Sequence, residues 1–591
     1  MKQELAQAVA TVVNDLFGVD IAVELTRPDE QFGDFATNIA MQLTKVVGKN
    51  PRAIAEELAV KLREIPFLSA VTVAGPGFLN LRVHDETLLQ NLQATPSQTL
   101  AGKTILVEYS DPNPFKPLHA GHLYTTLVGD SIARLIERAG AKTIRLNFGG
   151  DVGLHVGKSM WAILNALGGE HPEKLGEIAE AERASWLGAR YVEGNNAYED
   201  DESAKSEIIA CNKRVYALHD QNDHESAFAQ IYWTCREWSY RYFATLYEQL
   251  QVVPFDRFIP ESEVTPIGLE EVNLMTEQGI FEHSDGAVVY RGDESKGLHT
   301  RVFINREGIP TYETKDVGLS QLKWYDYPLF DESIIITANE QAQYMQVVLA
   351  AIHEFAPKPA ERTRHITHGV VKLAGGVKMS SRKGNIVSAL DILNSARDAA
   401  KASQVNSTEE NMLSAVKYAF VKNRIGGDIV YDPDESVALE GNSGPYLQYA
   451  HARARSILRK SEDTAVRSAA GERSEPGERG MTESEASLSP EEGRASLQSM
   501  DEASDLTPEE RTLARKLTEY AEVVERATAE LMPHHICTYL YELAQTFNRF
   551  YEHSQVIGDE REAVRLHLVQ IYADTLKNGL NLLGIHAPDK M

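Results

Sequence analysis

Two histidines, His119 and His122, have the residue type and spacing for phosphate chemistry. They close the run Val107-Glu-Tyr-Ser-Asp-Pro-Asn-Pro-Phe-Lys-Pro-Leu-His-Ala-Gly-His122, which begins in an apolar strand at 105–107 and passes through a proline-broken turn. A helix is predicted to begin at His-Ala-Gly-His, so that free backbone N–H groups and both imidazoles face one anionic site. Gly121 has no side chain, which leaves its backbone open to a flat base. The pattern indicates a site for a triphosphate and adenine; the simpler alternative is two core histidines beside a turn.

The helix that positions this corner is predicted from apolar spacing. Four residues fall on one face of it, namely Val128, Ile132, Leu135 and Ile136. Gly140 should end the helix, because glycine is the usual residue just beyond a helix C-terminus. A strand, a turn and an amphipathic helix in this order favour the nucleotide-site interpretation over the core interpretation.

A second candidate segment, 372–385, lies far downstream. Glycines near both of its ends predict a loop. Within six residues it holds three cations and two hydroxyls, which suit the oxygens of a leaving pyrophosphate. These six residues are Lys378, Met379, Ser380, Ser381, Arg382 and Lys383. Such a loop is weak support by itself, because short basic loops are common and usually only solvated.

Together the two segments resemble the HIGH and KMSKS signatures of class I aminoacyl-tRNA synthetases, which activate an amino acid with ATP and transfer it to tRNA. The resemblance implies an ATP site at the following positions: His119, Gly121, His122, Lys378, Met379, Ser380, Ser381 and Lys383. It also implies that ATP enters with Mg²⁺ as a substrate. His119 would face the α-carboxylate and the α-phosphate, and His122 the ATP phosphates.

Further motifs narrow the resemblance to arginyl-tRNA synthetases, in the order in which that family has them. The matching segments are 31–38 (Gln-Phe-Gly-Asp-Phe-Ala-Thr-Asn), 74–80 (Ala-Gly-Pro-Gly-Phe-Leu-Asn), 112–122, 149–153, 308–316, 339–341 and 440–453. They extend along nearly the whole chain. The resemblance implies that the partners are L-arginine, ATP and tRNA(Arg), with no membrane, and that the protein is a cytoplasmic monomer.

The segment 310–316 supports arginine by its own chemistry. A guanidinium is a planar fork of donors, so a pocket for it needs a carboxylate that accepts in bidentate fashion. Thr311 can cap a helix that begins near Tyr312, which places Tyr312 and Asp316 on one helix face. Tyr312 would line the pocket and Asp316 would bind the guanidinium; an ordinary exposed aspartate is the alternative.

Three more arginine-site residues follow from the resemblance. Asn113 would hold the α-amino or α-carboxylate group, and Gln341 would line the amino-acid site. Glu261 is placed by a looser match and would add a second carboxylate. Asp151, in the turn Gly-Gly-Asp-Val-Gly, suits a site role and a structural turn equally well.

The second signature departs from the class pattern at Ser381, where KMSKS has a lysine. Family members that lack this lysine resemble the present chain in carrying one at Lys116, three residues before His119. The resemblance therefore implies three catalytic residues, Lys116, His119 and His122, with Lys116 stabilising charge on the pyrophosphate. A solvated loop lysine is the alternative.

Composition and length bound the remaining functions. The 591 residues exceed a single core, and no run of 18 apolar residues or signal-peptide pattern is present, which predicts a soluble intracellular protein. Cys211, Cys235 and Cys537 lack metal-ligand spacing, so no bound metal is predicted. The net charge of −27 does not exclude tRNA, because phosphate contacts need only a locally basic face.

Much of the negative charge lies at 461–510, which holds fourteen Asp or Glu residues against four Lys or Arg and no aromatic residue. Such a segment buries too little apolar area to offset its ordering entropy. The sequence predicts a solvated, disordered insertion that interrupts the helical region after Lys460; a functional tail is the alternative.

The predicted fold is multidomain. Residues 1–99 should form an α+β N-terminal domain that contacts tRNA, and 100–400 a Rossmann-type parallel-sheet catalytic domain with its site at the carboxyl edge. A helical insertion is expected at about 160–255. Residues 401–591 should form an all-α anticodon-binding bundle. Candidate tRNA contacts are Asn38, Tyr446, Tyr449, Arg453 and Arg455.

Two other classes of function compete with arginine–tRNA ligation. One is another nucleotidyltransferase with an HxGH corner, which has no use for a helical domain of nearly 200 residues. The other is a non-catalytic, synthetase-like RNA-binding protein, which is expected to lose His119, His122 or the acidic pocket residue, and all three are present. The ligase is the interpretation that accounts for most of the chain.

Overall fold

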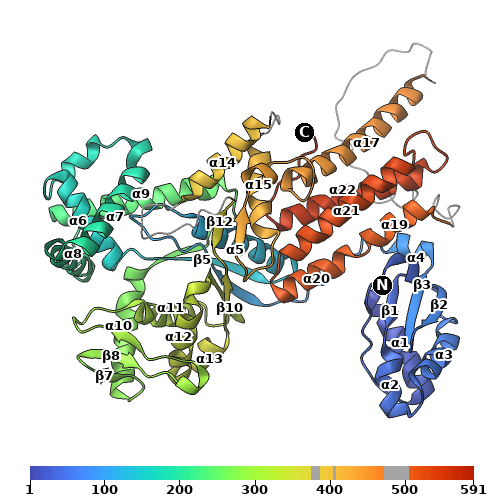
Figure 1. The fold of residues 1–591 in the computed structure, drawn as a ribbon, viewed down its shortest axis with the longest axis horizontal. Coiled ribbons are helices and arrows are strands. Elements are labelled where there is room, and N and C mark those ends of the chain that lie inside the picture. The colour runs from blue at the N-terminus through green and yellow to red at the C-terminus, as the bar shows by residue number, and fades with distance from the viewer. Residues whose placement is uncertain (375–386, 404–407, 472–504) are drawn as a thin grey trace, which may run out of the picture.

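The computed structural model describes residues 1–374, 387–403, 408–471 and 505–591. Figure 1 shows three parts: a small blue N-terminal domain, a central sheet with helices around it, and an orange-to-red group of C-terminal helices. The helical insertion lies at the far end of the molecule from the N-terminal domain. This is the multidomain architecture that the sequence predicts.

The N-terminal domain packs four helices with a three-stranded antiparallel sheet of order β1-β3-β2. Its elements are α1 (Lys2–Phe17), β1 (Phe35–Thr37), α2 (Ile39–Val47), α3 (Pro51–Leu62), β2 (Leu68–Ala74), β3 (Phe78–Val83) and α4 (Asp85–Gln90). Helix α3 begins as its sequence dictates: the Asn50 side chain accepts from the Arg52 amide, and Pro51 occupies the first helical position. The α+β prediction is confirmed for this part of the chain.

The central domain is built on a parallel sheet of order β11-β10-β4-β5-β6. The strands are β4 (Thr104–Glu108), β5 (Lys142–Gly149), β6 (Arg257–Pro260), β10 (Glu332–Ala338) and β11 (Thr363–His368). The strand order reverses between β4 and β10, and their carboxyl ends form the crevice in which such sheets bind ligands. Helix α5 (Ala120–Arg138) follows β4 and is buried along most of its length.

The predicted helical insertion lies between β5 and β6, and it begins a little earlier than expected. Its main helices are α6 (Leu154–Leu167), α7 (Arg183–Asp200), α8 (Glu202–Asp220) and α9 (Ala227–Gln249). They enclose a hydrophobic core of their own, which includes Val156, Met160, Ile231 and Cys235. Phe115, from the turn after β4, is buried in this same core.

Between β6 and β10 the chain forms an antiparallel unit that the sequence analysis did not predict. Strands β7 (Glu282–Ser284), β8 (Ala287–Tyr290) and β9 (Arg301–Ile304) pair in the order β7-β8-β9. The helices around this unit are α10 (Glu261–Glu277), α11 (Tyr312–Asp326), α12 (Ala342–Phe355) and α13 (Pro357–Glu361). Helices α10 and α11 carry the predicted carboxylates to the edge of the central sheet.

The C-terminal part is mostly helical, with one correction. Strand β13 (Ile429–Tyr431) pairs in parallel with β12 (Val371–Leu373), so the chain beyond 401 is not all-helical. The helices are α14 (Ala389–Ala402), α15 (Glu409–Val421), α16 (Pro433–Ser436), α17 (Gly444–Gly471), α19 (Pro508–Leu517), α20 (Tyr520–Glu530), α21 (His534–His553) and α22 (Glu562–Leu582). A three-residue strand has too weak a pattern to be predicted without its partner.

The boundaries of the acidic insertion also need correction. Helix α17 continues to Gly471, past Lys460, and the chain is structured again from 505. Glu510 belongs to the predicted insertion, yet it is fully buried and paired with Arg561 and Arg565. The predicted disorder itself concerns 472–504, which lie outside the described residues.

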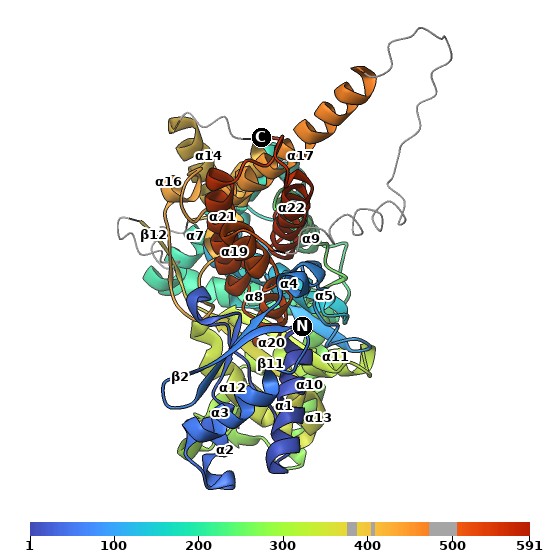
Figure 2. The same ribbon diagram turned by 90° about the vertical axis from the view of Figure 1, so that its right-hand side faces the viewer.

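The N-terminal domain is joined to the C-terminal helices by buried charges. Arg511 on α19 pairs with Asp34 at 2.7 Å and with Asp85 at 3.0 Å. Arg27 donates to Glu522 on α20 at 2.7 Å. Figure 2 shows the N-terminal domain below the C-terminal helices. In the described part of the chain, no helix is long and apolar enough to cross a membrane.

Candidate active site

The predicted corner lies at the switch point of the sheet, between the carboxyl end of β4 and the start of α5. Three non-glycine residues of its turn have left-handed backbones: Ser110 (φ 79°), Asp111 (φ 47°) and Phe115 (φ 67°). Such conformations cost energy and persist where surrounding contacts enforce them. Asp111 Oδ1 accepts from the Phe148 amide at 2.7 Å, and the Phe115 amide donates to Ser239 Oγ at 2.9 Å.

The backbone N–H groups that begin α5 are not free, which corrects the prediction that they would bind an anion. His119 Nδ1 accepts from the amides of Gly121 at 3.1 Å and His122 at 3.3 Å, so His119 acts as the N-cap. The Ala120 amide donates to the Val387 carbonyl at 3.1 Å. Sequence analysis missed this because histidine is an unusual N-cap residue, and its ring orientation depends on the folded turn.

The imidazoles take over the donor role that the backbone loses. Burial lowers the pKa of His119 to about 4 and also lowers the pKa of His122, so both rings are neutral. His122 Nδ1 accepts from the His119 amide at 3.4 Å, and the two rings stack at 3.7 Å. Because Nδ1 is an acceptor in both rings, the single proton of each lies on Nε2. The corner therefore offers two neutral N–H donors to an anion.

Gly121 has a structural reason for lacking a side chain. A Cβ atom there would lie 3.0 Å from His119 Cε1 and 3.1 Å from His119 Nδ1, which is tighter than ordinary contact. The glycine thus makes room for the capping ring. The packing of a base against Gly121 would be a second role for this glycine, and it stays a prediction.

Lys116 lies in the same turn and is half-buried, which is less exposed than the solvated-lysine alternative implies. Its Nζ is 4.3 Å from the centre of the Tyr191 ring on α7. Burial, and secondly repulsion from Lys158, lowers the pKa of Lys116 to about 8. Within the described ranges this ammonium has no ion-pair partner. It is therefore available to a phosphate.

Asp316 faces the site from α11, as the helix-face argument predicts. Burial raises the pKa of its carboxyl to about 7, and Tyr344 Oη donates to its Oδ2. Tyr344 comes from α12, three residues after Gln341, and the sequence analysis did not single it out. The predicted cap needs correction: α11 begins at Tyr312, but Thr311 Oγ1 donates to the Val302 and Phe303 carbonyls instead of capping the helix.

Glu261, at the first position of α10, is buried and forms an ion pair with Lys315. Lys315 Nζ also donates to the Val152 carbonyl at 3.3 Å. The half-exposed ring of Tyr312 lies 5.1 Å from the same Nζ, so it covers this ion pair. Burial raises the pKa of Glu261, although Lys315 opposes that shift.

Asn113 and Glu261 converge at Gly150. Asn113 Oδ1 accepts from the Gly150 amide at 3.0 Å. A Cβ on Gly150 would lie 2.4 Å from that oxygen and 3.1 Å from Glu261 Oε1, so only glycine fits between them. Because the oxygen of Asn113 is used as an acceptor, its Nδ2 group is left as the donor that can face a ligand.

Three carboxylates gather around a single lysine at the end of β4. Glu108 is buried and pairs with Lys323 from α11. Burial, and secondly repulsion from Glu108, raises the pKa of Asp111 well above its usual value, and Asp316 raises it further. Glu108 and Asp111 belong to the segment that the sequence analysis quoted, but it gave them no role. A bound cation would stabilise the charged forms of these carboxyls, so the cluster suits a cationic side chain.

Gln341 and Asp151 differ in their exposure to solvent and in their contacts. Gln341 ends the short 3₁₀ turn after β10, at the carboxyl edge of the sheet, and is exposed. Asp151 is fully buried and accepts from the Ser262 amide at 2.9 Å, from Ser262 Oγ at 2.7 Å and from Arg236 Nε at 2.9 Å. These contacts decide the open question about Asp151 in favour of a structural role beside Glu261.

The second signature lies outside the described residues. This applies to Lys378, Met379, Ser380, Ser381, Arg382 and Lys383. Among the residues that the structure describes, no group of three or more His, Cys, Asp or Glu side chains is arranged to hold a metal ion.

The candidate tRNA contacts of the C-terminal helices lie on α17. Tyr446 Oη accepts from Asn548 at 3.0 Å and borders a cavity of about 460 Å³ that Tyr541 and Arg549 also line. Tyr449 is exposed. Tyr446 thus forms part of the cavity wall. Arg453 lies 4.6 Å from the centre of the Tyr551 ring, and Arg455 pairs with Asp589 at 3.2 Å.

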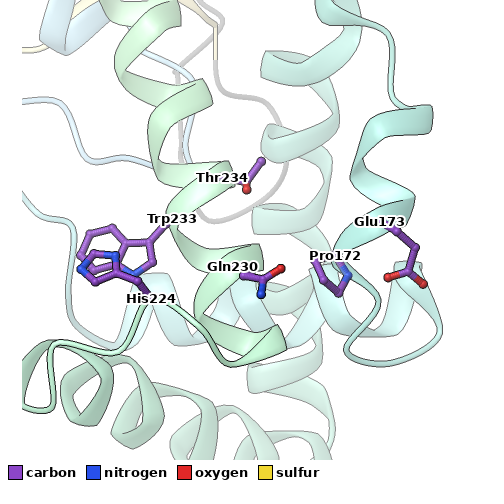
Figure 3. Close-up of a pocket in the computed structure, with 6 residues that line it drawn as sticks. All are labelled: Pro172, Glu173, His224, Gln230, Trp233 and Thr234. Atoms are coloured by element: carbon purple, nitrogen blue, oxygen red, sulfur yellow. The ribbon is translucent and has the colours of Figure 1, made fainter.

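Asn38 lies in the N-terminal domain, far from α17 in the sequence. It borders a cavity of about 420 Å³ whose walls include the exposed rings of Phe32 and Phe78. A third cavity, of about 580 Å³, lies in the helical insertion between α9 and the segment at 172–173 (Figure 3). None of the predicted site residues lines that cavity.

The parallel sheet with two histidines at its switch point, followed by a mostly helical C-terminal part, agrees with the class I tRNA synthetase architecture that the two signatures predict. The model described as "tRNA synthetases class I (R), catalytic domain" matches residues 84–436, which is more than half of the chain. The models "Arginyl tRNA synthetase N terminal domain" and "DALR anticodon binding domain" match 1–83 and 447–591. The chain therefore belongs to the arginyl branch of the class I tRNA synthetases.

Individual relatives agree along their whole length. The arginine–tRNA ligase of Porphyromonas gingivalis (strain W83) is 29% identical over 100% of this chain and 99% of that protein. The arginine–tRNA ligase of Lactobacillus delbrueckii subsp. bulgaricus is 30% identical, with complete coverage of both chains. The structure of Thermus thermophilus arginyl-tRNA synthetase, 26% identical, superposes with a TM-score of 0.75 and covers both chains completely.

Proposed function

We propose that this chain ligates L-arginine to tRNA(Arg) with the site residues in the roles given below. The arginine carboxylate attacks the α-phosphorus of ATP and pyrophosphate leaves, which gives arginyl-adenylate. A hydroxyl of the tRNA 3′-terminal ribose then attacks the carbonyl carbon, and AMP leaves. The single observation that carries the proposal is the acidic pocket of Asp316 and its neighbours beside two neutral histidines and an unpaired lysine.

In the amino-acid half of the site, Asp316 accepts from the guanidinium, with Tyr344 fixing one of its oxygens. Glu261 supplies a second carboxylate at the edge of the pocket, and Tyr312 and Gln341 line its rim. The Nδ2 donor of Asn113 faces the α-carboxylate of arginine. A site built on such hydrogen bonds rejects analogues that lack them by roughly 10⁴-fold, so lysine is a poor substrate.

In the phosphate half, the Nε2–H groups of His119 and His122 donate to phosphate oxygens, and Lys116 stabilises negative charge on the leaving pyrophosphate. Neutral donors suit this role because they need no counter-ion before ATP binds. ATP enters as its Mg²⁺ complex, so the metal ion is part of the substrate. The loop residues Lys378, Met379, Ser380, Ser381 and Lys383 complete the ATP site.

The flanking parts bind tRNA. We assign residues 1–99 to tRNA contact through Asn38 and the aromatic rings beside it. Residues 401–591 read the anticodon by stacking and base-edge contacts, which is how single-stranded RNA loops are usually recognised. On α17, Tyr446, Tyr449, Arg453 and Arg455 are the candidate contacts. Because one chain carries all these parts, we propose a monomer acting in the cytoplasm, where tRNA is charged.

The decisive experiment is aminoacylation of an unfractionated tRNA pool with each labelled amino acid in turn. Arginine alone should be charged. Efficient charging with any other amino acid would overturn the substrate assignment. Pyrophosphate exchange that needs no amino acid would favour another nucleotidyltransferase, and tRNA binding without any exchange would favour a non-catalytic RNA-binding protein.

A further inference from the structure

The part of the turn that carries Lys116 packs against the helical insertion. Phe115, the residue before the lysine, is fully buried in the core of the insertion. Its amide donates to Ser239 Oγ on α9 at 2.9 Å, and its ring centre lies 5.5 Å from that of Tyr232. Helix α9 therefore fixes the chain on one side of Lys116, where Phe115 has a left-handed backbone.

Helix α7 fixes the other side of the same turn. Gly188 packs against Pro117, since a Cβ on this glycine would lie 3.3 Å from Pro117 Cδ. Tyr191 is three residues further along α7 and so lies on the same face of that helix. Its ring centre is 4.3 Å from Lys116 Nζ. One face of α7 thus contacts both the lysine and the proline that follows it.

The contact with an aromatic ring suits a cation that must remain free to bind a ligand. An aromatic face attracts an ammonium through the quadrupole of the ring, without bringing a negative charge. A carboxylate in the same place would neutralise Lys116, and an incoming phosphate would have to displace it. Throughout the described part of the chain, no carboxylate pairs with Lys116.

We propose that Tyr191 is a positioning residue for Lys116. Its ring holds the ammonium at the ATP phosphates without neutralising it, and through this contact the helical insertion controls the chemical step. The proposal rests on the proposed function, in which Lys116 binds those phosphates. The proposal gives Tyr191 no contact with substrate. Tyr191 acts only through the lysine, and this makes its contribution separable from a general structural one.

The test uses the full-length chain and arginine-dependent ATP–pyrophosphate exchange, with tRNA present and absent. Tyr191→Ala should lower kcat about tenfold and leave the arginine KM within twofold. Tyr191→Phe keeps the ring face and should stay within twofold of wild type. Tyr198→Ala is the matched control, because Tyr198 lies on the same helix and holds another lysine, Lys158, at the same 4.3 Å. It should leave kcat nearly unchanged.

The double variant distinguishes positioning from packing. In a Lys116→Ala background, Tyr191→Ala should cause no further loss of kcat, because the residue through which it acts is gone. An equal fold-loss in both backgrounds, or a Tyr191→Phe variant as impaired as Tyr191→Ala, would overturn the proposal. A Tyr191→Ala enzyme with wild-type kcat would overturn it as well.

Failure of the proposed function has a different signature. If the wild-type chain exchanges no pyrophosphate with arginine, or if Lys116→Ala retains full activity, the assignment of the site is wrong. The Tyr191–Lys116 coupling is then measured by ATP affinity in the same set of variants. Tyr191→Ala should weaken ATP binding only where Lys116 is present, and equal weakening in both backgrounds would contradict the coupling.

Discussion

The two halves of the active site hold their charges in opposite ways. In the arginine half, the charged groups have partners before any ligand arrives: Asp316 accepts from Tyr344, and Glu261 pairs with Lys315. In the phosphate half, both histidines are neutral, and Lys116 rests on an aromatic ring without a counter-ion. Both halves lie at the carboxyl edge of the same sheet, so the difference does not arise from the fold.

The contrast follows from what each half must do. A substrate guanidinium keeps its charge throughout the reaction, so a prearranged carboxylate can bind it equally in the ground and transition states. Charge on the pyrophosphate grows only as the bond to the α-phosphorus breaks. A cation that is not already neutralised stabilises that developing charge. We therefore expect the arginine half to set the arginine KM and the phosphate half to set kcat.

The largest effect should come from the phosphate half. Lys116→Ala is expected to lower the rate of arginine activation at least a hundredfold, about 2.7 kcal/mol, while the arginine KM changes little. Pyrophosphate exchange measures both quantities. Lys383→Ala should cost less; the reverse order would mean that the second signature supplies the phosphate cation and Lys116 does not.

A smaller effect is expected from the arginine half. Asp316→Asn keeps the size of the side chain but removes the charge that faces the guanidinium, so the arginine KM should rise at least about tenfold. The affinity for ATP should stay close to wild type. A rise in the arginine KM of less than about threefold would show that Asp316 does not contact the substrate.

The pH dependence of arginine binding should follow Asp316. Its pKa is raised to about 7 in the free protein, and a bound guanidinium favours the charged carboxylate. Affinity for arginine should therefore rise with pH through 7, roughly tenfold between pH 6 and pH 8, and level off above that. Calorimetric titration measures this. Glu108, Glu261, Lys323 and Tyr344 also act on this carboxyl, and Asp111 and Glu261 have raised pKa values of their own, so Asp316→Asn is the control, and its affinity should vary less with pH.

The smallest effect tests the positioning of that carboxylate. Tyr344→Phe removes one hydrogen bond to Asp316 and preserves the ring, so the arginine KM should rise several-fold with kcat unchanged. The variant should also shift the pH profile upward, because the lost donor stabilised the charged form. If kcat changed as much as the arginine KM, the arginine half would not act on KM alone.

Local pattern and motif spacing predicted the parts of the fold that are regular. The strand at 104–108, the helix that follows it and the α11 face with Asp316 could all be read from residues close in sequence. The three-residue strand β13 could not, because its only support is a parallel partner more than fifty residues away. The antiparallel strands β7 to β9 were missed for another reason: they are short, and the local hairpin signal Asp285-Gly286 between β7 and β8 was overlooked.

The site could be predicted to the level of residues but not of bonds. His119 was identified, yet its role as the cap of α5 depends on a ring orientation set by the folded turn. Tyr344 carries no sequence signal of its own, since it reaches Asp316 from a neighbouring helix. Tyr191 contacts Lys116 although it lies more than seventy residues further along the chain. Such contacts between distant segments are what sequence patterns leave undetermined.

The most direct test of the division between the halves is the double variant Lys116→Ala/Asp316→Asn in arginine-dependent pyrophosphate exchange. We expect the double variant to combine the kcat of Lys116→Ala with the arginine KM of Asp316→Asn, so that the two losses in transition-state free energy add. A double variant that is no worse than Lys116→Ala alone, or a single variant that changes kcat and KM together, would contradict this expectation.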